Sequence, residues 1–119
     1  TKLPMRTREE VKTHYSTKDL ILCSKHDIRE EYNTTFNHLK KYLVKNNTKE
    51  HSNGEIIYTD PMPGVKADIT HGYTVHSIQG ETLATDATVY IDLRRMFSDR
   101  MLYTAVSRAR RMDQIYLIE

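Results

Sequence analysis

The order of hydrophobic and polar residues along the chain shows two recurring patterns, compact apolar runs and apolar residues at helical spacing. Compact runs of about four to eight residues are typical of buried strands, whereas spacings of three and four residues predict helices with one apolar face. The compact runs predict strands over 19–23, 55–58, 73–75, 88–93 and 114–118. Helical spacing predicts a short helix over 5–14, a long one over 26–46 and a third that begins after Ser98. Strands that alternate with helices favour an α/β domain with a mostly parallel sheet.

The long helix expected over 26–46 carries a stripe of apolar residues that would face the core. The stripe consists of Ile28, Tyr32, Phe36, Leu39 and Leu43. Ser24 stands before the helix as a candidate N-cap, and Asp27 follows three residues later in a shortened version of the capping box. Polar residues at 46–48 are expected to end the helix.

The third helix is expected to begin at its N-cap Ser98, with Asp99 in the first turn, where the helix dipole favours an acidic residue. Its last turn would contain Arg108, Arg110 and Arg111, where the dipole favours basic residues. An arginine that is rooted on a packed helix and free at its tip suits a fixed contact to phosphate. Arg108 is therefore either a phosphate ligand or a helix-terminal cation that only balances the dipole. The apolar face of this helix consists of Met101, Leu102, Ala105, Val106 and Ala109.

Composition limits the classes of protein to which the chain can belong. A chain of 119 residues forms at most one domain, and we treat 1–119 as that domain. The formal net charge is +2, so no overall positive field indicates a nucleic acid. Arginines nevertheless gather in the last third of the chain, where they form either a solvated face or a binding surface. They are Arg94, Arg95, Arg100, Arg108, Arg110 and Arg111.

Cys23 is the only cysteine, so the chain cannot form an internal disulfide, and its apolar neighbours predict a buried thiol. We expect an intracellular protein in a reducing compartment, the cytoplasm or the nucleus. No apolar stretch is long enough to cross a membrane, and no membrane partner is expected. The six histidines occur with neither H-E-x-x-H nor paired cysteines, so no metal site is predicted. The start at Thr1 suggests a fragment of a longer protein.

A cluster of polar residues follows the short strand expected over 73–75. His76, Ser77 and Gln79 place hydrogen-bond donors and acceptors at the exit of this strand, and Gly80 allows the backbone to approach a ligand closely. Ligands of α/β domains usually bind at the carboxyl ends of the strands. The stretch 73–82 is therefore a candidate binding turn.

Two stretches of the chain together resemble a known family. The run Thr-Val-His-Ser-Ile-Gln-Gly at 74–80 and the run Tyr-Thr-Ala-Val-Ser-Arg-Ala-Arg at 103–110 are similar to motifs V and VI of superfamily 1 helicases. The nearest patterns are those of the C-terminal RecA-like domain in the RecD-like and UvrD-like groups. The resemblance implies a three-layer RecA-like fold and the C-terminal motor domain of an ATP-dependent DNA helicase.

The resemblance also implies which residues serve ATP. Arg108 matches the catalytic motif VI arginine that reaches across a cleft toward the γ-phosphate, and Arg110 or its neighbour could share this role. Gln79, Gly80 and Glu81 would lie on the ATP side of motif V. In this chain the glutamate directly follows the glycine, whereas the UvrD-like pattern places it two residues after the glycine.

Other residues would contact the nucleic-acid backbone in the resembled family. Thr74, His76 and Ser77 of motif V have this role, although the RecD-like pattern often has lysine at the position of the serine. The unit of strand, serine and helix around Ser24 resembles motif IV. Its polar positions are Ser24, Lys25 and Asn33. The serine and the asparagine could equally be only a helix cap and a helix side chain.

ATP and Mg²⁺ would be held mainly by an N-terminal RecA-like domain of the same protein, because this sequence contains no G-x-x-x-x-G-K motif. The chain alone should therefore not hydrolyse ATP. Single-stranded DNA is the expected partner, with RNA as an alternative. Two other functions are open: an RNA helicase domain of a positive-strand virus, and a degenerate module that kept the fold as a non-catalytic binding platform.

Relatives in the RecD-like group commonly insert a small β-barrel before motif V. The residues available here are 49–69, and they include Asp-Pro-Met-Pro-Gly at 60–64, where two prolines oppose regular structure. We therefore expect a reduced hairpin or a bare loop in place of the barrel.

Overall fold

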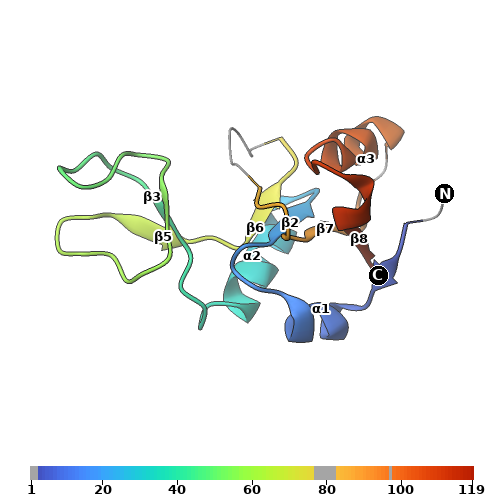
Figure 1. The fold of residues 1–119 in the computed structure, drawn as a ribbon, viewed down its shortest axis with the longest axis horizontal. Helices are drawn as coiled ribbons and strands as arrows, with labels where there is room; N and C mark the ends of the chain where they lie inside the picture. The colour runs from blue at the N-terminus through green and yellow to red at the C-terminus, as the bar shows by residue number, and fades with distance from the viewer. Residues whose placement is uncertain (1–2, 77–82, 97) are drawn as a thin grey trace.

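The computed structural model describes residues 3–76, 83–96 and 98–119, which form two sheets and three α-helices (Figure 1). The larger sheet is all-parallel, with the strand order β1-β8-β7-β2-β6, and the smaller sheet is antiparallel, with the order β4-β3-β5. The strands are β1 (Met5–Arg6), β2 (Leu20–Cys23), β3 (Tyr42–Val44), β4 (Ile56–Ile57), β5 (Ala67–Ile69), β6 (Gly72–Thr74), β7 (Val89–Asp92) and β8 (Ile115–Ile118). The helices are α1 (Arg8–His14), α2 (His26–Thr35) and α3 (Asp99–Val106), and a 3₁₀ turn, η1 (Met112–Gln114), precedes β8. The expected α/β domain is confirmed.

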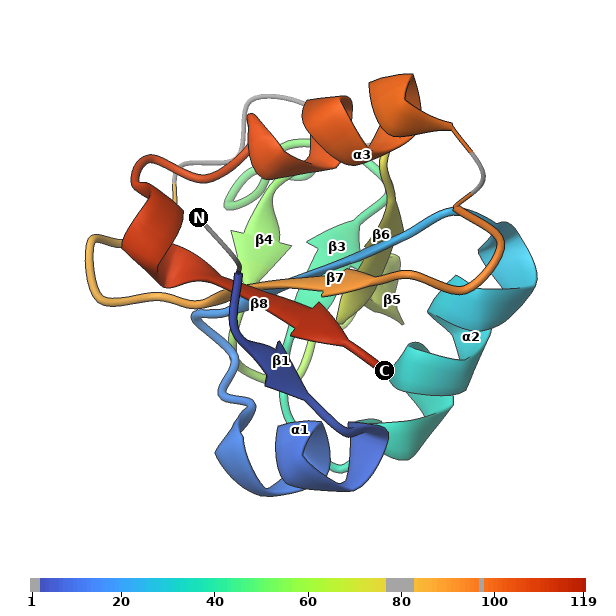
Figure 2. The ribbon, with the colours of Figure 1, turned by 90° about the vertical axis from the view of Figure 1, so that its right-hand side faces the viewer.

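The parallel sheet is covered on both faces, with α3 on one side and α1 and α2 on the other (Figure 2). Residues of β2 alternate between the two cores, since Leu20 and Leu22 pack on the α3 side and Ile21 and Cys23 on the α1–α2 side. The same alternation in β7 buries all four of its residues. Continuous apolar strands of this kind are what a parallel sheet between two helical layers requires. The expected burial of Cys23 is confirmed, and this burial raises the pKa of its thiol.

The beginning of the chain differs from the single helix expected over 5–14. Met5 and Arg6 instead form β1, which pairs with β8, and α1 starts only after them. Thr7 explains this division because it forms a complete capping box with Glu10: Thr7 Oγ1 accepts from Glu10 N at 3.1 Å, and the glutamate carboxylate accepts from Thr7 N at 3.0 Å. Val11 then anchors the short helix in the core.

The prediction of one long helix over 26–46 was wrong in the length of the helix and in its N-cap residue. α2 ends at Thr35, and the apolar residues that continue its period form β3 instead. Lys25 occupies the N-cap position without a side-chain hydrogen bond. Ser24 Oγ, the expected cap, donates instead to the carbonyl of Arg94 at 2.7 Å. Asp27 forms an ion pair with Arg95.

The small antiparallel sheet replaces the reduced hairpin or bare loop expected over 49–69. Its central strand is β3, where Tyr42 faces Ile57 of β4 on one side and Ile69 of β5 on the other. Val44 of β3 and Ile57 of β4 are the buried apolar residues of its strands. The sheet projects beyond β6, the outer strand of the parallel sheet, so that the molecule extends 47 Å along its longest axis (Figure 1).

The sheets are joined at a crossing of two chain segments, where Thr70 N donates to Lys41 O at 3.0 Å. Lys41 is also buried, and its ammonium group donates to the carbonyl of Asp19 at 3.1 Å, next to the start of β2. This pair of contacts fastens the small sheet to the amino end of the parallel sheet.

The third helix begins as expected, because Ser98 Oγ accepts from Met101 N at 3.1 Å. Its expected apolar face is also confirmed, with Ala105 buried and the other members packed against the same core. The helix ends earlier than expected, at Val106, and Ser107 is its C-cap. Arg108 and the two arginines that follow therefore lie in turns after the helix, and their expected position in its last turn was wrong. None of the helices in the described ranges is long and apolar enough to cross a membrane.

Candidate functional site

Three neighbouring strands end side by side at the carboxyl edge of the parallel sheet. The register places Cys23 of β2 beside Thr74 of β6 and Leu22 beside Ile91 of β7. Because all strands are parallel, the residues that follow β2, β6 and β7 emerge at one edge, which is where α/β domains bind ligands. The sequence candidates of motif IV and motif V are thereby brought together.

Within the stretch 74–80, the described residues differ in their access to solvent. Thr74 is only 7% exposed at the end of β6. Val75 N then donates to Cys23 O at 3.0 Å, which extends the strand pairing by one residue. His76 is the first exposed side chain after the strand. Of the other motif V candidates, Ser77, Gln79, Gly80 and Glu81 lie outside the described residues.

Arg108 connects the second sequence motif to the first. Its Nη2 lies 3.5 Å from the carbonyl oxygen of Val75, at the outer limit of a hydrogen bond. The backbone at Arg108 is held by a bond from its amide to Ala105 O at 3.1 Å, and Ala105 is buried in the core. The arginine is thus rooted in the packed end of α3, while its side chain is exposed and reaches the end of β6.

The two arginines that follow have different surroundings. The guanidinium of Arg111 is engaged twice, with Asp113 Oδ1 at 2.9 Å and with the carbonyl of Thr85 at 3.0 Å. Arg110 is exposed and has no side-chain partner among the residues that the structure describes. Arg111 therefore has a local structural role, whereas Arg108 and Arg110 keep guanidinium groups that carry no neighbouring carboxylate within the described part of the chain.

Gln114 organises this arginine segment, and sequence reasoning missed it. Its Oε1 accepts from the amides of Arg110 and Arg111 at 3.1 and 3.0 Å. Its Nε2 donates to carbonyls in the segment 84–87, at 3.1 Å to Ala87. Gln114 is only 4% exposed, and its bond to the carbonyl of Ala87 is buried. The available signal was a glutamine directly before the apolar run of β8.

A network of charges holds the turn that follows β7. Asp92 is 1% exposed and receives hydrogen bonds from Tyr32 Oη and from Arg94, whose Nη2 lies 2.9 Å from the carboxylate. Arg94 also forms an ion pair with Glu31 at 3.0 Å. The carboxylate of Asp92 raises the pKa of Arg94 by hydrogen bonding, and burial raises the pKa of Tyr32, to which the bond to Asp92 adds. This network fixes the position of Arg94, whose carbonyl oxygen accepts the hydrogen bond from Ser24 Oγ. The serine therefore links the end of β2 to the turn that follows β7.

Asn33, a motif IV candidate, fastens α2 to β6. Its Oδ1 accepts from His71 N at 2.7 Å and from Gly72 N at 2.9 Å. The helix approaches the strand so closely here that a Cβ atom on Gly72 would lie 3.2 Å from the carbonyl oxygen of Arg29. Of the motif IV candidates, only Lys25 carries a charge, and its exposed side chain at the start of α2 has no partner within the described ranges.

The described residues contain no group of three or more His, Cys, Asp or Glu side chains that could hold a metal ion. No family model matches the sequence, and no curated protein matches it at a significant level. The function is therefore argued from the side chains and their positions. At the carboxyl edge, these are Arg108 beside the end of β6, His76 directly after it and Lys25 after the neighbouring strand.

Proposed function

We propose that the chain is the C-terminal RecA-like motor domain of an ATP-dependent superfamily 1 DNA helicase. One observation carries the proposal: Nη2 of Arg108 lies 3.5 Å from Val75 O, so two sequence motifs that are 33 residues apart meet at one edge of the sheet. In this function the domain supplies an arginine to ATP and backbone contacts to single-stranded DNA. ATP and Mg²⁺ are held mainly by an N-terminal RecA-like domain, which carries the phosphate-binding loop.

Arg108 suits the ATP role for three reasons. Its guanidinium is exposed, it has no carboxylate partner in the described ranges, and the buried end of α3 fixes its backbone. A planar and permanently charged group can neutralise the negative charge that develops on the transferred phosphoryl group. Arg110 is the second choice on the same grounds, and the ion pair with Asp113 argues against Arg111.

The role of binding single-stranded DNA belongs to exposed residues that follow β2 and β6. His76 and Lys25 are exposed after adjacent strands, and both side chains can donate hydrogen bonds to phosphate oxygens. Contacts of this kind hold a nucleic acid without reading its sequence. Thr74 is nearly buried and Ser24 is tethered to Arg94, so we assign these two residues to the support of the turns.

The test uses the longer protein in which a phosphate-binding domain precedes this chain. We expect Arg108→Ala to lower the DNA-stimulated kcat for ATP hydrolysis by about 10³-fold or more, with ATP binding nearly intact, because the arginine acts on the charge of the transition state. Phosphate release measures kcat, and a fluorescent ATP analogue measures binding.

The matched control is Arg100→Ala, because Arg100 is exposed on the first turn of α3, away from Val75. Its turnover should equal that of the unmodified protein. If Arg108→Ala hydrolyses ATP as fast as the unmodified protein, the proposed catalytic role of this arginine is contradicted. A full-length protein that binds DNA but hydrolyses no ATP would instead identify the chain as a binding platform.

A further inference from the structure

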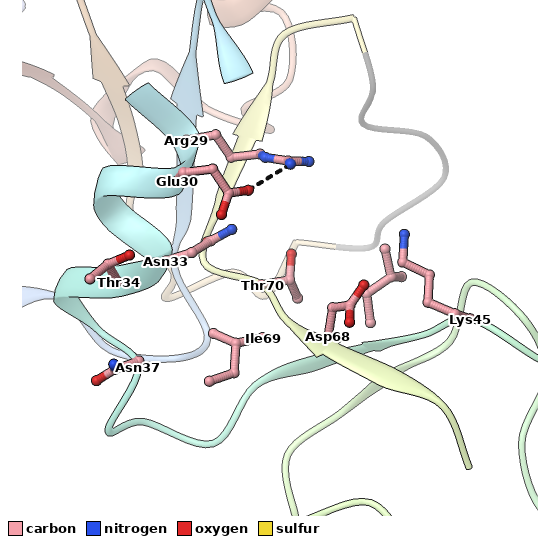
Figure 3. Close-up of a pocket in the computed structure, with 10 residues that line it drawn as sticks. Arg29, Glu30, Asn33, Thr34, Asn37, Lys45, Asp68, Ile69 and Thr70 are labelled. Carbon is pink, nitrogen blue, oxygen red and sulfur yellow. Dashed lines mark hydrogen bonds and ion pairs between the residues drawn. The ribbon is translucent and has the colours of Figure 1, made fainter. Parts of the chain in front are cut away.

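A groove separates α2 from the small antiparallel sheet (Figure 3). Its volume is about 390 Å³, within the range of about 300–1,000 Å³ that is typical of ligand pockets. Arg29 and Asn33 stand on the helical wall, and Lys45, Asp68 and Ile69 stand on the wall formed by β3 and β5. None of the roles described above uses this groove, although its helical wall begins one turn from Lys25 at the carboxyl edge.

Two opposite charges on the sheet wall have no partner among the residues that the structure describes. Neither the ammonium of Lys45 nor the carboxylate of Asp68 forms an ion pair or side-chain hydrogen bond with any residue in the described ranges. Lys40, shortly before β3, shows the contrasting case, because it is paired with Asp60 at 3.0 Å. The groove therefore presents a cation and an anion that are both available to a ligand.

Asn33 adds a donor whose orientation is fixed. Its Oδ1 is occupied by two backbone amides of the β6 segment, so its Nδ2 faces the groove (Figure 3). Ile69 contributes a half-buried apolar surface to the lining of the groove. A ligand that matches these groups has a phosphate for Lys45, a flat apolar face for Ile69, and an amino group for Asp68.

We propose that this groove seats one nucleotide of the single strand, with its phosphate at Lys45 and an amino-bearing base, cytosine or adenine, at Asp68. A carboxylate accepts a hydrogen bond from the exocyclic amine of cytosine, and it repels the carbonyl oxygen that thymine presents at the same position. The proposal rests on the proposed function, because it extends the path of the strand from the carboxyl edge along α2 to the small sheet. The groove would give this domain a preference for certain bases at one position. All other contacts with the bound single strand would be made to its sugar-phosphate backbone.

Fluorescence anisotropy with the 119-residue chain and labelled ten-nucleotide strands of dC or dT tests the proposal. We expect dC to bind about threefold to tenfold more tightly than dT, and Asp68→Asn to remove most of this difference. Lys45→Gln should weaken both strands about fivefold and lower the slope of log affinity against log salt by about 0.7, the value for one phosphate contact on a single strand. Lys49→Gln is the matched control, because Lys49 is exposed in the loop between β3 and β4 and does not line the groove.

The outcomes separate the groove from the proposed function. If the chain binds strands and His76→Ala weakens the binding, while Lys45→Gln and Asp68→Asn behave like Lys49→Gln, the strand role stands and the groove proposal is overturned. If the unmodified chain binds neither strand at low salt, both are overturned. Circular dichroism of each variant checks that the fold is retained, and all three groove and control positions are exposed, so their substitution leaves the core intact.

Discussion

His71 is a buried titratable residue in the segment that links β5 to β6. It packs edge-on against Tyr15 and near Phe36, and Tyr15 Oη lies 2.7 Å from its Nδ1. Its Nε2 has no hydrogen-bond partner among the described residues. Burial, with a smaller contribution from the nearby charge of Lys41, lowers the pKa of His71 to about 4. The neutral imidazole is therefore the form that the folded protein accommodates.

This lowered pKa predicts a loss of stability in mild acid. Between about pH 6.5, the ordinary histidine pKa, and pH 4, the unfolded chain binds a proton that the folded chain does not, so stability falls as the pH falls through this window. The full effect is on the order of 3 kcal/mol, because each pKa unit corresponds to about 1.4 kcal/mol. Urea unfolding at pH 7, 5.5 and 4.5 measures it.

His71→Gln should flatten this dependence, since glutamine can still bond to Tyr15 but does not titrate. His26→Gln is the control, because His26 is exposed on the first turn of α2 and should leave the pH profile unchanged. The same acid sensitivity in His71→Gln as in the unmodified protein would show that another group is responsible.

At the scale of elements, the contact between α2 and β6 leaves little room for a side chain at Gly72. A Cβ atom there would lie 3.2 Å from the carbonyl oxygen and 3.3 Å from the Cα atom of Arg29, and both are backbone atoms that cannot rotate away. We expect Gly72→Ala to lower the free energy of unfolding by about 1–3 kcal/mol, as overpacking of a close contact usually does. Thermal and urea unfolding measure this change.

The outcome that contradicts this expectation is an unchanged or increased stability of Gly72→Ala. A matched substitution is Ala84→Ser, because Ala84 is exposed and also tolerates a small increase in volume. Its free energy of unfolding should change by less than about 0.5 kcal/mol, as is usual for surface positions. The difference between the two variants isolates the cost of separating the helix from the strand.

The elements that the sequence predicted well are those whose signal is local. β2, β7 and β8 are compact apolar runs, and α3 starts at a serine cap with one apolar face. α2 was extended too far because the apolar spacing of a helix continues by chance through Leu43. That residue belongs to β3, which forms only when β4 and β5 pair with it, and such distant pairing leaves no local signal.

The same limit separates the predicted site residues from those that were missed. Two sequence motifs indicated that Arg108 and the end of β6 serve one site, and the side chain of Arg108 does lie beside Val75. The roles of Gln114 and Asp92 could not be predicted, because the carbonyls that accept from Gln114 Nε2 are about thirty residues away along the chain and the partner Tyr32 of Asp92 is 60 residues away. Burial gives these polar groups their importance, and burial is a property of the folded chain.

At the scale of the whole molecule, the chain lacks one half of the proposed ATP site. The 119 residues contain no G-x-x-x-x-G-K motif, and such a loop is needed to cradle the β- and γ-phosphates. We therefore expect the chain alone to release no phosphate from ATP above background, with or without single-stranded DNA. A coupled phosphate assay at millimolar ATP measures this. Turnover that copurifies with the chain and is lost in Arg108→Ala would contradict this division of labour.

The position of Asn33 has a consequence for solubility. β6 is the outermost strand of the parallel sheet, and an outer strand with free amides can recruit a strand from another molecule and start aggregation. The side chain of Asn33 already occupies the amides of His71 and Gly72, so the beginning of this border is closed to intermolecular pairing. One asparagine thus closes the start of this outer strand to a second chain, in addition to holding its helix in place.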